Sequence, residues 1–116
     1  VREFAAGGAQ VFLNISNDTW LGDTGGPAQH LNMARMRAIE NRRWLLRPTN
    51  SGITASIDPY GRVVARAPRD QRAALEAPYG FVTETTFYTR HGDVFAVGCA
   101  IIALAALLLL LRRRQA

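Results

Sequence analysis

The spacing of apolar residues predicts a strand and then a long helix in the first half of the chain. Val11 to Ile15 is a short, nearly continuous apolar run, which is typical of a buried strand. After a polar stretch, the segment from Ala28 to Leu46 has apolar residues at helical spacing, with Pro27 well placed near its start. Pro48 ends the segment, so we expect a helix of about five turns. Its apolar stripe consists of Leu31, Ala34, Ala38 and Leu45, with Ile39 and Leu46 beside it.

A β-hairpin is predicted after the helix. Apolar residues at positions 53, 55 and 57 alternate with polar ones, which indicates a strand with one buried face. The Asp58-Pro59-Tyr60-Gly61 sequence suits a turn, because proline presets φ at the second position and glycine suits the fourth. Val63 and Val64 then begin the returning strand. We also expect a short helix over residues 1–6 and short strands around residues 73–76 and 81–85.

Residues 94–111 form the most strongly apolar segment, "VFAVGCAIIALAALLLLL". About 18 uncharged residues at ~1.5 Å rise make a helix of ~27 Å, close to the thickness of a bilayer's hydrocarbon core. Arg112, Arg113 and Arg114 follow, and such a cluster marks the cytoplasmic side of a membrane helix. The sequence therefore predicts two parts: an α/β portion over residues 1–90 on the far side of the membrane, and a transmembrane helix with a basic tail over residues 91–116.

Length and charge narrow the function classes. The net charge of +5 includes the three terminal arginines, which leaves an excess of only two elsewhere and no ribonucleoprotein or zinc-finger motif. We therefore expect no nucleic-acid partner. About 90 residues outside the apolar segment can bury only a modest core. This portion is expected to be one piece of a larger protein and not to fold alone, because its strands would lack neighbours.

The candidate chemical groups do not add up to a complete enzyme. The sole cysteine, Cys99, lies in the apolar segment, where a thiolate is disfavoured. His30 and His91 are far apart and have no second metal-ligand partner, so no metal site is expected. His30 is expected in the first turn of the predicted helix. Ser16 is not in a nucleophile-elbow motif, and all fourteen basic residues are arginines, with no lysine. No cofactor is implied either.

Two polar stretches remain as candidates for a binding site: "NISNDTWLGDTGGP" and "LLRPTNSGITASIDPYGRVV". Asn17 and Asp18 could simply cap a turn, Trp20 could be a surface aromatic, and the stretch from Asn50 could be an ordinary turn. Polar residues directly after a buried strand are, however, a common place for ligand contacts in α/β proteins. The patterns alone leave both interpretations open. Glu40 lies three residues from both Arg37 and Arg43, a spacing that permits surface ion pairs.

The combination of "SNDTW", "QHLNMARMRAIE", "TNSGITA" and "DPYGRV", in this order and continued by "YTRHGD", resembles the bacterial apolipoprotein N-acyltransferase family. The resemblance covers essentially the whole chain, as the C-terminal part of the family's nitrilase-like domain plus the last membrane helix. It implies a four-layer α-β-β-α domain in the periplasm, held on helices in the bacterial inner membrane, with the C-terminal tail in the cytoplasm. The wider nitrilase superfamily would not be expected to end in a membrane helix with an arginine cluster.

The resemblance also implies a reaction. The family moves a fatty acyl chain from a phospholipid to the amino group of the diacylglyceryl-modified N-terminal cysteine of an apolipoprotein, through a thioester on a Glu-Lys-Cys triad. This chain has no lysine, and its only cysteine lies in the membrane segment. No triad residue can therefore be assigned here, and the triad is expected upstream of Val1.

Within that resemblance, the loop from Ser16 to Gly22 is expected to form the wall or rim of a pocket. Asn17 and Trp20 are the candidate pocket residues, with Asn50 a third, whereas Arg35, Arg37 and Glu40 are expected to be structural. Two other functions remain open. One is a membrane-anchored, non-catalytic domain that binds anionic lipid or a partner protein. The other is a nitrilase-type amidase with a membrane anchor.

Overall fold

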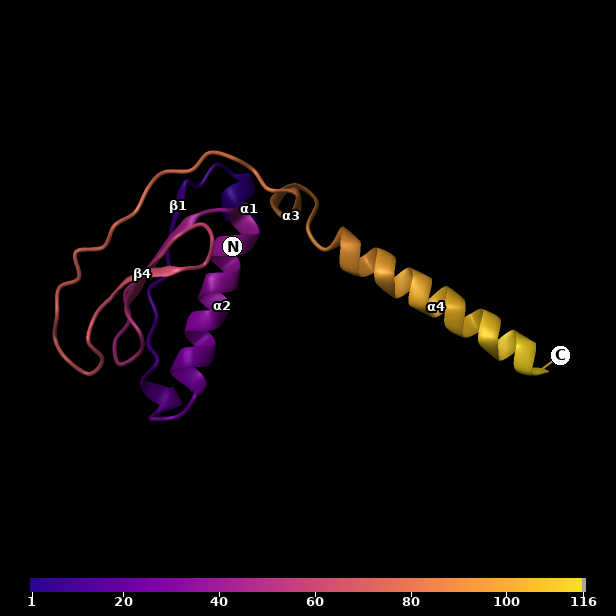
Figure 1. The fold of residues 1–116 in the computed structure, drawn as a ribbon, viewed down its shortest axis with the longest axis horizontal. Helices are drawn as coiled ribbons and strands as arrows, with labels where there is room; N and C mark the ends of the chain where they lie inside the picture. Colours follow the sequence, from indigo (N-terminus) through magenta and orange to yellow (C-terminus); the bar gives the residue numbers. More distant parts are fainter. Residues whose placement is uncertain (116) are drawn as a thin grey trace.

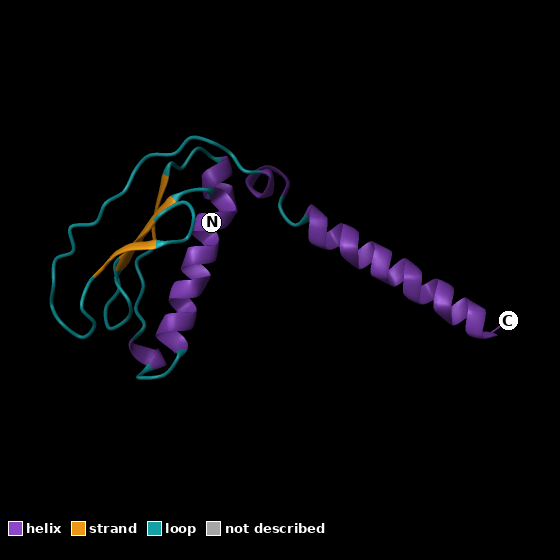
Figure 2. Ribbon diagram, in the orientation of Figure 1, coloured by secondary structure: helices purple, strands orange, loops and turns teal. Residues whose placement is uncertain are grey.

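A computed structural model describes residues 1–115 and contains a small α/β unit followed by one long helix. Figure 1 shows the long helix projecting away from the α/β unit, and Figure 2 shows a helix lying along the strands. The elements are α1 (Arg2–Ala6), β1 (Val11–Leu13), the 3-10 turn η1 (Thr19–Leu21), α2 (Gly26–Asn41), β2 (Trp44–Arg47), β3 (Ala55–Ile57), β4 (Val63–Arg66), α3 (Phe87–His91) and α4 (Val94–Gln115).

The four strands form one sheet in the order β1-β2-β3-β4. β1 and β2 are parallel and are joined by the crossover helix α2, whereas the β2–β3 and β3–β4 pairs are antiparallel. Helix α2 buries the side chains of Leu31, Ala34 and Ala38 in the same core cluster as Phe12 and Leu45 of the sheet. The predicted apolar stripe is therefore confirmed in its first three members. One helix on one face of a mixed sheet agrees with the predicted α/β class.

The predicted helix over residues 28–46 is wrong at its C-terminal end. Helix α2 ends at Asn41, and Arg42 adopts a left-handed conformation with φ of 51° that turns the chain back. Leu45 and Leu46 belong to strand β2, where they pair with both β1 and β3. By its pattern alone, a short apolar run is compatible with either a helix or a strand. Here it forms a strand because β1 and β3 pair with it on both sides.

The predicted surface ion pair between Arg43 and Glu40 does not form. Its side chain is only 1% exposed and donates to the carbonyl oxygens of Ala9 and Glu84, at 2.6 and 2.5 Å. Glu40 pairs with Arg37 instead, at 3.0 Å. Since the helix has already ended, Arg43 no longer lies on the same helical face as Glu40. It points inward and joins three separate segments.

The hairpin is confirmed, with a detail that the pattern did not predict. β3 and β4 flank a turn in which Gly61 donates to the carbonyl oxygen of Asp58 at 2.9 Å, and Gly61 has a positive φ of 79°. Ser56 is buried together with its strand neighbours, although alternation predicted an exposed face. The reason is that its hydroxyl donates to the carbonyl oxygen of Pro78, so the segment after β4 covers the outer face of the strand.

The strands predicted around residues 73–76 and 81–85 are absent from the described part of the chain. Residues 67–86 run as an irregular segment around the sheet, as Figure 1 shows. Val82 donates one backbone hydrogen bond to Gln10 at 3.2 Å, just before β1, but the segment does not continue as a strand. β1 is also shorter than predicted, and Leu13 and Ile15 are exposed, which corrects the prediction of a buried run over Val11 to Ile15.

Helix α4 agrees with the predicted apolar segment. Over Val94–Arg113 its mean hydropathy reaches 3.0, and none of this stretch is buried against the rest of the chain. By length and composition it could cross a membrane. The chain is therefore a mixed α/β unit followed by one candidate membrane helix.

Candidate functional site

Three loops converge at one edge of the sheet. β1 and β2 are parallel, and β4 runs in the same direction because both β2 and β4 are antiparallel to β3. The carboxyl ends of these three strands therefore lie at the same edge, which is where α/β proteins commonly place ligands. The first two loops are joined by backbone hydrogen bonds, from Ser16 N to Pro48 O and from Asn50 N to Ser16 O, each 3.1 Å. We call this region the site edge: residues 16–23, 48–54 and 67–73.

Asp18 is the polar centre of the site edge. Its carboxylate accepts hydrogen bonds from Ser16 Oγ at 2.8 Å and from Arg47 Nη2 at 3.0 Å, and its Oδ1 lies 2.8 Å from His30 Nδ1. The side chains of Asp18 and Arg47 are fully buried. Gly52 lies against the same carboxylate so closely that a Cβ atom at position 52 would overlap it. Asp18 thus ties the loop after β1 to the end of β2, to α2 and to the loop after β2.

The protonation state of Asp18 follows from these contacts. Burial acts to raise the pKa of Asp18, but the hydrogen bonds from Ser16 and His30 and the charge of Arg47 outweigh it, so the pKa lies below its usual value. Burial lowers the pKa of Arg47, and the charge of Asp18 opposes that effect. The pair is therefore ionised at neutral pH, which makes it a fixed buried ion pair.

Thr19 joins two of the three candidate pocket residues, Asn17 and Asn50. Its backbone N–H and its hydroxyl donate to Asn17 Oδ1, at 3.1 and 2.6 Å, and its hydroxyl oxygen accepts from Asn50 Nδ2 at 3.5 Å and from Ser51 Oγ at 2.9 Å. The indole N–H of Trp20 donates to the carbonyl oxygen of Asn17 at 3.0 Å. Trp20 is nevertheless 77% exposed, so its ring faces outward from the loop.

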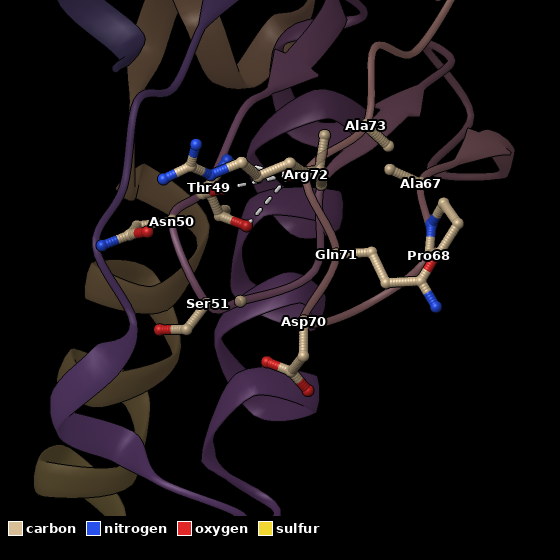
Figure 3. A pocket seen from close by; sticks show the side chains of 11 residues that line it. Thr49, Asn50, Ser51, Ala67, Pro68, Asp70, Gln71, Arg72 and Ala73 are labelled. Carbon is tan, nitrogen blue, oxygen red and sulfur yellow. Dashed lines mark hydrogen bonds between the residues drawn. The ribbon is translucent and has the colours of Figure 1, made fainter.

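An open cavity of about 560 Å³ lies between the loops that follow β2 and β4. Figure 3 shows its lining, in which Arg72 extends toward Thr49. Asn50 lines this cavity, whereas Asn17 and Trp20 lie outside it. A smaller pocket of about 130 Å³ lies beside Asp18. The larger cavity is lined by residues 49–52, Thr54, 67–68 and 70–73.

Arg69 connects the third loop to the first. Its Nη2 donates to Gly22 O at 3.2 Å and pairs with Asp23 Oδ1 at 3.1 Å. The loop after β4 is thereby held against the loop after β1, and the smaller pocket lies between them. The arrangement offers hydroxyl, amide and guanidinium groups, which can bind and orient a polar substrate.

Reactive groups are sparse at this edge. Among residues 1–115 no group of three or more His, Cys, Asp or Glu side chains could hold a metal ion. Cys99 is an exposed thiol on α4, outside the site edge. What the described residues supply is a polar wall and an exposed aromatic ring.

Sequence reasoning missed the Asp18–Arg47 pair and its contact with His30. From the sequence, His30 is predicted only to lie in the first turn of a helix, and Asp18 only as a residue that could cap a turn. One available signal was Arg47, an arginine at the end of an apolar run, because a buried guanidinium requires a partner. The 29-residue separation of Asp18 and Arg47 gave no indication of which partner it would find.

Comparison with known proteins adds two findings. The family model described as carbon-nitrogen hydrolase matches residues 1–78. Proteins named apolipoprotein N-acyltransferase are similar over almost the whole chain: one from Azotobacter vinelandii is 48% identical over 98% of this chain, one from Pseudomonas putida 46% over 91%, and one from Geobacter metallireducens 38% over 98%. These alignments cover 23%, 22% and 22% of the relatives, so the chain spans less than a quarter of their length.

Proposed function

The chain belongs to the carbon-nitrogen hydrolase family, and from this premise we propose that it is part of a membrane N-acyltransferase acting on lipoproteins. The observation that carries the proposal is the 38–48% identity, over almost the whole chain, to proteins named apolipoprotein N-acyltransferase. The proposed donor is a phospholipid, and the proposed acceptor is the α-amino group of a diacylglyceryl-modified N-terminal cysteine. Helix α4 supports the membrane setting by its length and apolar composition.

The proposed reaction has two steps. A glutamate takes the proton of a cysteine thiol, and the thiolate attacks the ester carbonyl carbon of the phospholipid. The C–S bond forms, the ester C–O bond breaks, and the protonated glutamate returns its proton to the leaving alkoxide, which departs as a lysophospholipid. The acceptor amine then attacks the thioester, forming the amide bond and releasing the thiolate, while a glutamate removes the proton from the amine. A lysine stabilises the oxyanion in both steps. We place this Glu-Lys-Cys triad upstream of Val1, because the sequence contains no lysine and its one cysteine is in α4.

The role proposed for this chain is to form one wall of the substrate pocket. The Asp18–Arg47 pair holds the loop after β1 in place, and Thr19 links that loop to Asn50. Trp20 presents an exposed ring to an acyl chain. Asn17 shapes the turn that supports the ring.

Replacing Trp20 with alanine in the full-length protein tests this role. We expect kcat/KM for transfer from phospholipid to a diacylglyceryl-cysteine peptide to fall on the order of tenfold, since a contact worth about 1.4 kcal/mol is lost. Tyr60→Ala is the matched control, because Tyr60 is also an exposed aromatic, 62% accessible, but lies in the β3–β4 turn at the opposite edge of the sheet. Equal activity of the two variants would contradict the proposal that Trp20 is a pocket residue.

An amidase with a membrane anchor is the second candidate, and the observation that favours it is the carbon-nitrogen hydrolase match itself. The two functions differ in product. An amidase releases ammonia or an amine from an amide, whereas the acyltransferase leaves a lysophospholipid and a new amide. Incubating the full-length protein with phospholipid and acceptor peptide, and separately with simple amides, distinguishes them by mass spectrometry. If neither product is formed, the result favours the third possibility, a membrane-anchored binding domain.

A further inference from the structure

Helix α3 is fastened to the α/β unit along one of its sides. Thr89 is only 1% exposed, and its hydroxyl donates to Asn41 Oδ1 at 3.0 Å. Thr86 caps the helix by accepting from Thr89 N at 3.0 Å, and its hydroxyl donates to the carbonyl oxygen of Glu40 at 2.6 Å. Arg2 donates to the carbonyl oxygen of Thr89 at 3.2 Å. These bonds attach α3 to the C-terminal end of α2 and to α1.

The other side of α3 is uncovered and carries one large apolar side chain, that of Phe87. Phe87 is 67% exposed, and its ring lies 4.5 Å, centroid to centroid, from the ring of His91 one turn later. Arg90 is exposed beside them. An exposed phenylalanine next to cationic or titratable groups is the composition of a helix that lies in a membrane interface, with the ring among acyl chains and the charges among phosphates.

The chain connectivity identifies which surface α3 can reach. Only Gly92 and Asp93 separate α3 from the apolar helix α4, which begins at Val94. If α4 crosses a membrane, its first residues lie at the boundary of the hydrocarbon core, and the headgroup layer outside that boundary is roughly 5–8 Å thick. A five-residue helix attached by two residues must lie within or directly upon that layer.

We infer that α3 is a membrane-contact helix: its Phe87 side inserts into the phospholipid interface, while its Thr89 side holds the α/β unit at a set height and tilt. The inference rests on the proposed membrane function, since it requires α4 to span a bilayer. In this arrangement α3 contacts a phospholipid surface. The hydrogen bonds of Thr86 and Asn41 then fix the position of α2 relative to α3.

Photocrosslinking of the full-length protein tests this inference without requiring acyl transfer. Phe87 is replaced by p-benzoylphenylalanine, which is of similar shape, and the protein is irradiated in nanodiscs of phosphatidylethanolamine and phosphatidylglycerol. Arg72 and Arg90 bound a tryptic peptide of residues 73–90, in which lipid adducts are detected by mass spectrometry. The control is the same replacement at Met33, which is 61% exposed on α2. Elution volume in size-exclusion chromatography confirms that both variants fold.

We expect at least tenfold more phospholipid adduct at position 87 than at position 33. Crosslinking of position 87 to another segment of the protein would overturn the inference, because the exposed side of α3 would then be covered by protein. Equal adduct yields at the two positions would also overturn it. Lipid adducts at position 87 without acyl transfer would retain the inference while contradicting the proposed function, so the two failures are distinguishable.

Discussion

At the scale of single residues, Asp18 determines the geometry of the site edge. One buried carboxylate contacts Ser16, His30 and Arg47, and these residues come from a loop, a helix and a strand. Removing one partner of a buried ion pair leaves an uncompensated charge, which costs more than the pair contributes when intact. The fully buried side chain of Asp18 therefore fixes the start of the segment that contains Thr19 and Trp20.

Asp18→Asn should lower the free energy of unfolding of the full-length protein by about 3–5 kcal/mol at pH 7, because the charge of Arg47 is left buried without a partner. The pH dependence should change too. Since the pKa of folded Asp18 is lowered, its contribution is complete above the unfolded pKa of about 3.9 and is lost as the pH falls through the lower folded pKa. The variant should therefore lose less stability than wild type below about pH 4.

Denaturant unfolding in detergent between pH 7 and pH 3 measures both effects. Asp23→Asn is the matched control, since that carboxylate is also paired with an arginine but its side chain is 92% exposed. A variant at position 18 that is as stable as the one at position 23 would show that the buried pair contributes nothing.

Gly52→Ala should also disturb the site edge. The new Cβ would overlap the Asp18 carboxylate, so either the loop after β2 or the ion pair must shift. We expect a loss of about 1–3 kcal/mol in stability, as for other overpacked sites. Gly25→Ala serves as the control, because a Cβ atom added at position 25 would have no neighbouring atom within 4 Å. Thermal unfolding of the two full-length variants decides: equal midpoints would contradict the close contact at position 52.

At the scale of elements, the hairpin and α2 behave differently. The β3–β4 turn depends on Asp58, whose carboxylate accepts from the backbone N–H groups of Tyr60 and Arg62, at 2.9 Å each, and from Arg62 Nε at 2.6 Å. Burial acts to raise the pKa of Asp58, but these bonds outweigh it and lower the pKa overall. All of these partners lie within four residues, so the turn is a local structure. The end of α2, in contrast, depends on residues distant in the sequence.

Asp58→Ala should loosen this turn while leaving α2 intact. We expect a loss of about 1–3 kcal/mol from the lost hydrogen bonds to the charged carboxylate, together with faster amide hydrogen exchange at Tyr60 and Arg62. Hydrogen exchange of the full-length protein, read by mass spectrometry on the hairpin and α2 peptides, checks this. Glu76→Ala, which removes an exposed carboxylate, is the control. Unchanged exchange in the hairpin would show that Asp58 does not organise the turn.

At the scale of the whole molecule, the α/β unit and α4 differ in how their apolar side chains are covered. The unit buries its core between α2 and the sheet. Figure 1 shows α4 projecting from the unit, and the apolar stretch of α4 is not buried against the rest of the chain. In water such a helix would be unfavourable, and a bilayer supplies the surface that it lacks. Arg112 and Arg113 at its far end predict the direction in which it would insert.

The expected orientation places the C-terminus in the cytoplasm and the α/β unit in the periplasm. A fluorescent protein fused after Ala116 of the full-length protein should therefore fluoresce, and alkaline phosphatase at the same point should be inactive, because each reporter folds in only one compartment. Fusions made after Gly92 should give the opposite pattern. Active phosphatase after Ala116 would contradict the predicted orientation.

Local chemistry determined much of this protein without reference to tertiary structure. The Asp58–Gly61 turn, the stripe of Leu31, Ala34 and Ala38, and the apolar run from Val94 depend on residues close together in the sequence. Their backbone conformations follow from turn preferences and from periodic burial. Family membership was likewise predictable, because the motifs and their order are properties of the sequence.

Tertiary structure decided the remaining features. Residues 44–47 form a strand because β1 and β3 offer hydrogen-bonding edges on both sides, which no local pattern records. Asp18 finds Arg47 across 29 residues, and Thr19 finds Asn50 across 31, because parallel pairing brings the ends of β1 and β2 to one edge. The burial that makes the Asp18–Arg47 contact strong arises only when α2 packs on the sheet. The sequence therefore proposes candidate residues, but the contacts that hold them in position exist only in the folded chain.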